Sequence, residues 1–398
     1  MPVKNKILLN TLHIIVDGLF DCVPILLSFM IISFAAGEKE VGVIISLSNM
    51  VITIAGLSTI FFSQHFGLFR TISLILLLYG IGFFTNAFSQ NVYLAGFCFI
   101  IGNAGFGLFH NVAFSYLTAN SARRSLGKAM GDFAAIGDIG RMPLVSLAAF
   151  IAALSLFGVP GWRIVCLTYG LGALLFAGYI FLSTSHQKET IKQATFTAAA
   201  EKKYLPAFSL LRNRQYALPM SASILDAFGS NQVFVFLPFL LFAKGIDPKI
   251  IASFALAFTF GCFLGKTALG RLVDTFGTRK VFVVSEVMMA ILLGILLLGQ
   301  QLFIVIGASF LLGIVTKGTV PVVQTIITEP VQKHEYDDIF AINGFSRGIA
   351  NMVSPLLFGF IASSVSINWS FGIMAIAAAG AVIPVLMMDK NIPQVKYT

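Results

Sequence analysis

The 398-residue chain is very apolar for its length, with 57% hydrophobic residues, 11% charged residues and a mean hydropathy of +0.90. A soluble domain carries roughly a quarter of its residues as charged side chains, and disorder requires low hydrophobicity, so both classes are excluded. The formal net charge of +9 comes from basic residues spread over short polar segments, which argues against a nucleic-acid-binding surface. The composition predicts a protein that crosses a lipid bilayer many times.

Twelve apolar stretches predict membrane-spanning helices, because about 20 apolar residues cross a hydrocarbon core about 30 Å thick. The first six are expected at residues 10–35, 41–63, 71–88, 92–119, 127–157 and 163–183. The second six are expected at residues 215–243, 250–270, 280–299, 302–328, 337–364 and 369–388. A polar segment separates the two sets. We therefore predict an N-terminal six-helix bundle (1–183), a cytoplasmic connector (184–214) and a C-terminal six-helix bundle with a short tail (215–398).

The distribution of Lys and Arg predicts the orientation of these helices. If the N-terminus is cytoplasmic, 18 of the 26 basic residues lie on the cytoplasmic side and four on the opposite side. Such an asymmetry follows the positive-inside rule. We expect a multi-pass protein of the inner cell membrane with both termini in the cytoplasm.

The sequence offers no sign of an enzyme. No nucleophile with an attendant base is visible, and the glycine-rich segment 102–107 has neither a preceding strand nor a phosphate-binding lysine. The four cysteines are dispersed through apolar stretches without Cys-x-x-Cys spacing, so they predict neither disulfides nor a zinc site. We expect no cofactor, and transport driven by an ion gradient or by the gradient of the solute itself.

Two polar loops, one in each half, indicate an internal repeat. Gly67 and Gly277 are 210 residues apart, and each lies in a short loop between two apolar stretches. Loops that recur one half-chain apart predict two parallel six-helix bundles. The predicted gate motif of these loops consists of Gly67, Arg70, Gly270, Arg271, Asp274, Gly277, Arg279 and Lys280.

The second loop resembles the signature of the major facilitator superfamily, Gly-x-Leu-x-Asp-Arg-x-Gly-Arg-Lys. The resemblance implies the fold of that superfamily and function as a monomer. Three further segments are similar to fosmidomycin-resistance-type efflux proteins: 12–17 (Leu-His-Ile-Ile-Val-Asp), 105–110 (Gly-Phe-Gly-Leu-Phe-His) and 137–143, which holds Gly-Asp-Ile-Gly and then Pro143. This narrower resemblance implies export of small anionic or amphipathic compounds.

Ionisable residues inside the predicted spans are the strongest functional signal, since each costs about 2.5–3.5 kcal/mol to place at the centre of a membrane helix. In the N-terminal half, we predict proton-coupling roles for Asp17, Asp21, His110 and Asp138. Two purely structural roles are the alternatives. The acids of the first helix could form a hydrogen-bonded cluster that only packs the two halves of the chain together, and Asp138 could form an internal ion pair with Arg141. A metal site at His13, Asp17, Asp21 and His110 is a further alternative.

Three basic residues lie inside predicted spans, Arg141 in the first half and Lys317 and Arg347 in the second. They suggest an anionic solute, because guanidinium groups bind carboxylates and phosphonates in bidentate fashion. The predicted solute-binding residues are His13, Arg141, Asp226, Lys317, Asn343 and Arg347. The alternative is that the buried bases pair with the buried acids of the same spans. Lys266 and Glu286 are expected to belong to the cytoplasmic gate region.

These patterns together predict a proton-coupled secondary transporter that moves a small anionic or amphipathic solute by alternating access around a central cavity. Drug or metabolite efflux is the expected direction. Uptake or export of a carboxylate-rich solute such as an organic acid or a siderophore is one alternative. Divalent metal export and a non-transporting membrane sensor are two others. The expected partners are the solute, protons and the lipid bilayer.

Overall fold

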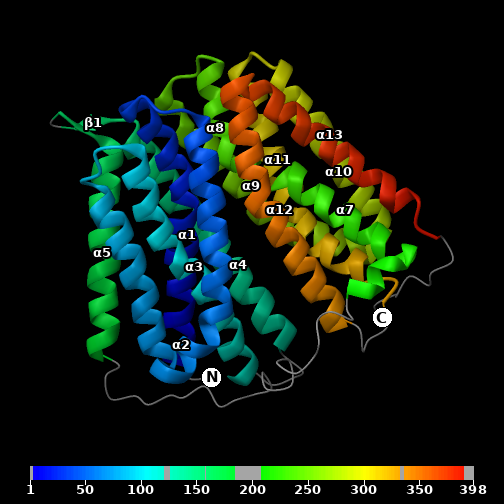
Figure 1. The fold of residues 1–398 in the computed structure, drawn as a ribbon, viewed down its shortest axis with the longest axis horizontal. Helices are drawn as coiled ribbons and strands as arrows, with labels where there is room; N and C mark the ends of the chain where they lie inside the picture. The colour runs from blue at the N-terminus through cyan, green and yellow to red at the C-terminus, as the bar shows by residue number, and fades with distance from the viewer. Residues whose placement is uncertain (1–2, 121–125, 157, 184–207, 332–335, 390–398) are drawn as a thin grey trace. The chain divides into compact units, whose positions relative to one another are not determined.

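A computed structural model describes residues 3–120, 126–156, 158–183, 208–331 and 336–389 (Figure 1). The described chain is almost entirely helical, and it divides into two compact units. The first unit holds residues 1–200 and 246–256, and the second holds residues 201–245 and 257–398. Much of the predicted connector (residues 184–207) lies outside the described residues.

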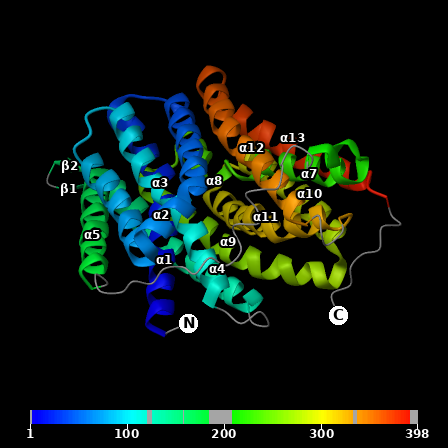
Figure 2. The same ribbon diagram turned by 60° about the horizontal axis from the view of Figure 1, so that its bottom comes forward.

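The first unit is built from long helices and one small hairpin. Its elements are α1 (Val3–Phe34), α2 (Glu38–Asn86), α3 (Val92–Asn120), α4 (Leu126–Ala152), β1 (Ser155–Leu156), β2 (Val159–Pro160) and α5 (Gly161–Ser183). The two strands pair antiparallel, with Ser155 opposite Pro160. Within the unit, α1 packs against α4, and α2 packs against both α3 and α5 (Figures 1 and 2).

The second unit repeats this pattern with more interruptions. Its elements are η2 (Phe208–Arg212), α7 (Arg214–Ser230), α8 (Val233–Ala243), most of α9 (Ile251–Phe276), α10 (Thr278–Leu298), α11 (Leu302–Thr328), α12 (Tyr336–Ser364) and α13 (Ile367–Leu386). The short η3 (Pro248–Ile250) precedes α9. Within the unit, α13 packs against α7 and α10. Lys244 ties the end of α8 to the end of α10 by donating to the carbonyls of Leu297 and Gly299, and its partial burial lowers the pKa of this amine.

The predicted spans agree closely with these helices. Among the described residues, eleven helical segments are long and apolar enough to cross a membrane. Two predicted spans, 41–63 and 71–88, are joined in one element, α2, which is kinked at Gly67. One predicted span, 215–243, is divided into α7 and α8 around Asn231 and Gln232. The predicted helix 127–157 was too long: α4 ends at Ala152, because the chain turns into the β-hairpin at Gly158, where φ is +76°.

Among the candidate spans of the described residues, the first one in each unit is the most buried. In the most apolar window of α1, 78% of the residues are buried, and the value for the segment 214–243 is 72%. The other candidate spans range from 28% to 61%. Polar residues on these two helices therefore lie inside the protein and must find partners there.

The two repeat glycines adopt a backbone conformation that L side chains rarely take. Gly67 has φ +73° within α2, and Gly277 has φ +85° at the residue before α10. In both places, the glycine lets one long apolar helix end and the next begin without a longer loop. The predicted tight turns are thus present at both copies of the repeat.

We expect Gly277→Ala to lower the stability of the chain by about 1–2 kcal/mol, since a Cβ at this φ approaches the following carbonyl oxygen. Thermal unfolding of the detergent-solubilised protein measures the effect. Gly294→Ala is the matched control, because Gly294 is helical and a Cβ there meets open space. Equal unfolding temperatures for the two variants would contradict the assignment of strain to Gly277.

Candidate functional site

Close contact between α1 and α4 creates the polar site of the first unit. A Cβ at Gly18 of α1 would lie 2.3 Å from Leu144 of α4, and a Cβ at Gly140 of α4 would lie 2.4 Å from Ile14 of α1. Small residues at such a crossing let two helix backbones approach closely. Short carboxylates on α1 can therefore reach a side chain on α4 directly.

Asp17 is the centre of this site. It is 3% exposed, and its carboxylate is approached by side chains from three places in the fold. Nη2 of Arg141 on α4 lies 3.0 Å from its Oδ2, and Nε2 of His13 on α1 lies 3.3 Å from the same oxygen. Nε2 of His110 on α3 lies 3.3 Å from Oδ1. The carboxylate thus joins three helices around one buried negative charge.

Arg141 brings two more carboxylates to the same point. Its Nε lies 3.0 Å from Oδ2 of Asp21, and its Nη1 lies 3.1 Å from Oδ1 of Asp138. One guanidinium therefore faces three carboxylates: Asp17, Asp21 and Asp138. Because a guanidinium carries a single charge, these three carboxylates outnumber it.

His13 is held in a fixed orientation. Its Nδ1 lies 2.9 Å from the carbonyl oxygen of Phe133, and its ring stacks on the ring of that residue with centroids 4.0 Å apart. A carbonyl oxygen only accepts hydrogen bonds, so Nδ1 carries the proton. The other ring nitrogen, Nε2, faces Asp17.

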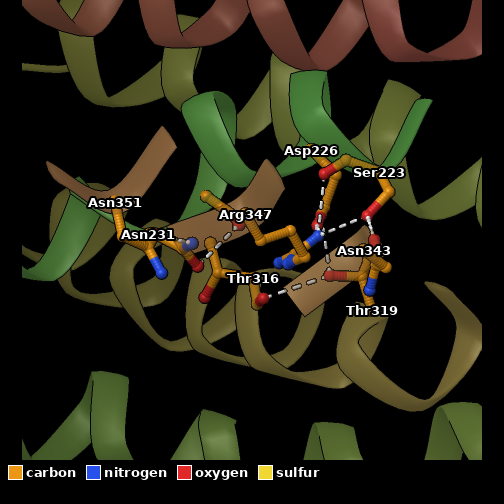
Figure 3. A network of polar contacts seen from close by, with 9 residues as sticks. Ser223, Asp226, Asn231, Thr316, Thr319, Asn343, Arg347 and Asn351 are labelled. Atoms are coloured by element: carbon orange, nitrogen blue, oxygen red, sulfur yellow. Dashed lines mark hydrogen bonds and ion pairs between the residues drawn. The ribbon is translucent and has the colours of Figure 1, made fainter. Parts of the chain in front are cut away.

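A second polar network lies in the second unit, around Asp226 of α7 (Figure 3). Asp226 is fully buried, and its Oδ2 accepts a hydrogen bond of 2.7 Å from Nη1 of Arg347 on α12. Its Oδ1 accepts one of 3.0 Å from the hydroxyl of Thr319 on α11. The same Nη1 of Arg347 donates to the backbone carbonyl of Ser223, 2.8 Å away. The pair is therefore satisfied from α7, α11 and α12.

Two amide contacts extend this network along α7 and α12. The hydroxyl of Ser223 donates to Oδ1 of Asn343 at 2.6 Å. Just after the end of α7, Nδ2 of Asn231 donates to Oδ1 of Asn351 on α12 at 2.6 Å. Figure 3 shows Asn343 beside Ser223 and Asn351 beside Asn231. These contacts join α7 to α12 by polar groups, with Asp226 and Arg347 between the two amide contacts.

Glu286 was expected in the cytoplasmic gate region, but it lies in the interior of the second unit. It is fully buried on α10, within electrostatic reach of Asp226 and Arg347. Neither of its carboxyl oxygens has a hydrogen-bond partner among the described residues. Its position on a helix flanked by apolar residues concealed this proximity, which depends on how α10 packs in its unit.

The two sites are related by the internal repeat. Asp226 follows Asp17 by 209 residues, and Thr319 follows His110 by the same 209 residues. Arg347 follows Arg141 by 206 residues. In each unit, an aspartate of the first helix therefore receives one partner from the fourth predicted span and an arginine from the fifth. Thr319 carries no charge and escaped the sequence analysis, although the repeat offset would have identified it.

The two sites differ in the side chains that surround the paired aspartate and arginine. The position equivalent to Asp21 is Ser230, 209 residues later, and the position equivalent to Asp138 is Gly344, 206 residues later. The equivalent of His13 is Ala222. The second unit thus keeps the paired aspartate and arginine, while the first unit adds two carboxylates and a histidine.

The remaining predicted residues lie on or next to α2, α9, α10 and α11. Lys317 is half-buried on α11 and Lys266 is half-buried on α9. Most side chains of the gate motif are exposed, namely Arg70, Arg271, Asp274 and Lys280. Arg279 is the exception, because its Nε lies 3.0 Å from Glu329 and its Nη1 donates to the carbonyl of Asp389 at 2.7 Å. Arg279 thereby joins the start of α10 to the ends of α11 and α13.

Comparison with known proteins agrees with this architecture. The family model described as Major Facilitator Superfamily matches residues 220–396. No curated protein matches the chain.

Several solved transporters are similar to the chain over nearly its whole length. One is a D-xylose–proton symporter, with a TM-score of 0.75, 18% identity and 99% of each chain covered. Another is a nucleoside transporter, NupG, with a TM-score of 0.74, 14% identity and coverage of 96% of this chain and 100% of that chain. A bacterial homologue of the human lysosomal transporter Spinster has a TM-score of 0.72, 13% identity and coverage of 98% and 96%.

These similarities confirm the predicted fold class. The chain is an all-α polytopic membrane protein with the fold of the major facilitator transporters. The match of the family model begins in α7, so the second unit carries the sequence signal of that superfamily. The narrower resemblance to fosmidomycin-resistance-type proteins stays a prediction.

We expect Arg347→Met to lower the free energy of unfolding by about 3–5 kcal/mol, because it leaves Asp226 as a buried charge without its partner. The double variant Arg347→Met with Asp226→Leu should recover most of this loss, since both charges are then removed. Chemical unfolding in detergent measures both. Arg212→Met, at an exposed position of η2, is the matched control. A double variant as unstable as the single one would show that Arg347 acts by packing and not by its charge.

Proposed function

We propose that the chain is a secondary active transporter of the major facilitator superfamily that moves a small solute across the inner cell membrane by alternating access, driven by a cation. The family model that matches the second unit and the fold shared with solved transporters support this proposal. One of those relatives is named a D-xylose–proton symporter, which makes coupling to a cation a natural expectation for the fold. The distribution of Lys and Arg supports cytoplasmic termini.

The observation that carries the coupling is the excess of acid around Arg141. Three carboxylates face one guanidinium where α1 packs against α4. Carboxylates that share a low-dielectric site repel one another. A bound cation lowers this repulsion, so the first unit has different energies with and without it. That difference is what a cation gradient needs in order to favour one conformation over another.

The roles predicted from the sequence keep their place within this proposal. Asp17, Asp21, Asp138 and His110 belong to the cation-responsive site, and the sequence predicts that the cation is a proton. The solute-binding assignment of His13, Arg141, Asp226, Lys317, Arg347 and Asn343 stays a prediction. Because Arg141 and Arg347 are each bound to carboxylates, an anionic solute would have to displace them. Export, implied by the narrower resemblance, also stays a prediction.

Asp17→Asn should abolish the response of the protein to a cation. The variant keeps the size of the side chain and removes the charge that joins α1, α3 and α4. Proteoliposomes on a solid-supported membrane are exposed to a jump in the concentration of one cation, protons or Na⁺, and the transient current is recorded. The wild-type chain should give a current with at least one cation, and Asp17→Asn should reduce it at least about tenfold.

Asp247→Asn is the matched control, because Asp247 is exposed and its side chain caps η3, a role that asparagine also performs. This variant should keep the wild-type current. Thermal unfolding verifies that both variants are folded. A full current in folded Asp17→Asn would remove this site from the coupling mechanism. No current with any cation from the wild-type chain would contradict cation-driven transport itself.

A further inference from the structure

We propose that His13, Asp17 and His110 form a binding site for one divalent first-row transition-metal ion. The proposal rests on the function proposed above only for the role of the ion, as the cation that acts on the first unit. The binding site itself is argued from the geometry, the hydrogen bonds and the charge of the residues around Asp17.

The three side chains present suitable ligand atoms to one another. Nε2 of His13 and Nε2 of His110 each lie 3.3 Å from a different oxygen of Asp17, and one ligand atom from each residue lies within 4.8 Å of the others. Two ligands bound at about 2.1 Å from one ion are at most about 4.2 Å apart. A small inward movement therefore closes the site. The side chain of His110 is 25% exposed and is the one with room to move.

The orientation of His13 places one ring nitrogen beside Asp17. Its Nδ1 lies on the carbonyl oxygen of Phe133, so Nε2 is the ring nitrogen that faces the carboxylate and is placed to bind a metal ion. A ring N–H held by a backbone carbonyl is also the usual outer-shell support of a metal-binding histidine.

Asp17 itself has a free acceptor. Its Oδ1 is buried and accepts no hydrogen bond within the part of the chain that the structure describes. Buried oxygens are nearly always hydrogen-bonded, so this atom calls for an additional partner. It is the oxygen that faces Nε2 of His110, and the partner that suits both atoms is a cation.

The charge of the described side chains favours a divalent ion over a monovalent one. The carboxylates of Asp17, Asp21 and Asp138 all face the single guanidinium of Arg141. Two imidazoles with one carboxylate favour Fe²⁺, Co²⁺ or Zn²⁺ over Mg²⁺ or Ca²⁺, which prefer oxygen ligands.

The absence of a side chain at Gly137 leaves space beside Nε2 of His13 and Oδ2 of Asp17. A Cβ at this position of α4 would lie 2.5 Å from Nε2 of His13 and 2.9 Å from Oδ2 of Asp17. A side chain at residue 137 would therefore occupy the space next to the two atoms that bind the ion. Gly137→Ala tests the site without removing any ligand.

Isothermal titration of the full chain in detergent, first stripped of metal with a chelator, provides the test. The probes are Co²⁺ and Zn²⁺, with Mg²⁺ as the comparison ion. We expect one Co²⁺ or Zn²⁺ per chain, weaker binding of Mg²⁺, and a loss of affinity of at least about tenfold in His110→Ala and in Gly137→Ala. His65→Ala is the matched control, because His65 is an exposed histidine of α2 whose Nδ1 contacts a backbone carbonyl four residues earlier.

Retained affinity in His65→Ala together with its loss in the other two variants supports the site. The absence of saturable Co²⁺ or Zn²⁺ binding in the wild-type chain would overturn it, as would equal affinity in folded His110→Ala and His65→Ala. The outcome is separable from the proposed function. Cation-induced currents that depend on Asp17 without any metal binding would refute the metal site alone, and metal binding without any current would refute the coupled transport alone.

Discussion

The structure depends on one constraint, which is that a charge buried in a membrane-spanning unit must find its counter-charge within that unit. Water is absent from the hydrocarbon region, so an aspartate on the most interior helix is stable only beside a donor from a neighbouring helix. Asp17 meets Arg141 in the first unit, and Asp226 meets Arg347 in the second. The glycines at the crossing of α1 and α4 follow from the same need, because Asp17 and Asp21 are too short to reach Arg141 across a wider gap.

The repeat preserved the pair and let its surroundings diverge. In the second unit, hydroxyl and amide groups such as Ser223 and Thr319 complete the hydrogen bonds of the pair. In the first unit, the corresponding region carries extra acids and two histidines. The two units therefore present different chemistry: Asp226 and Arg347 lie among hydroxyl and amide groups near the buried Glu286, and Asp17 and Arg141 lie among acids and histidines.

Much of the fold was predictable from the sequence, because every membrane helix must be apolar over about 20 residues wherever it lies. The charged members of both sites were predictable for the converse reason, since Asp17, Asp226 and Arg347 interrupt those apolar runs. Their pairing was not, because His110 and Arg141 lie 93 and 124 residues from Asp17 and only helix packing brings them together. Thr319 lacked a charge, and Glu286 lacked any local pattern that relates it to Asp226.

The cluster of three acids around Arg141 has a thermodynamic consequence for the proposed mechanism. A cation that binds the first unit in one conformation and not in another stabilises the conformation that binds it, by an amount set by the difference in affinity. In the proposed mechanism, the acids around Arg141 set that difference. Arg141 of α4 also pairs with Asp17 and Asp21 of α1. A cation bound at Asp17 would therefore change the forces between two long helices, and the proposed cation site is also a structural joint of its unit.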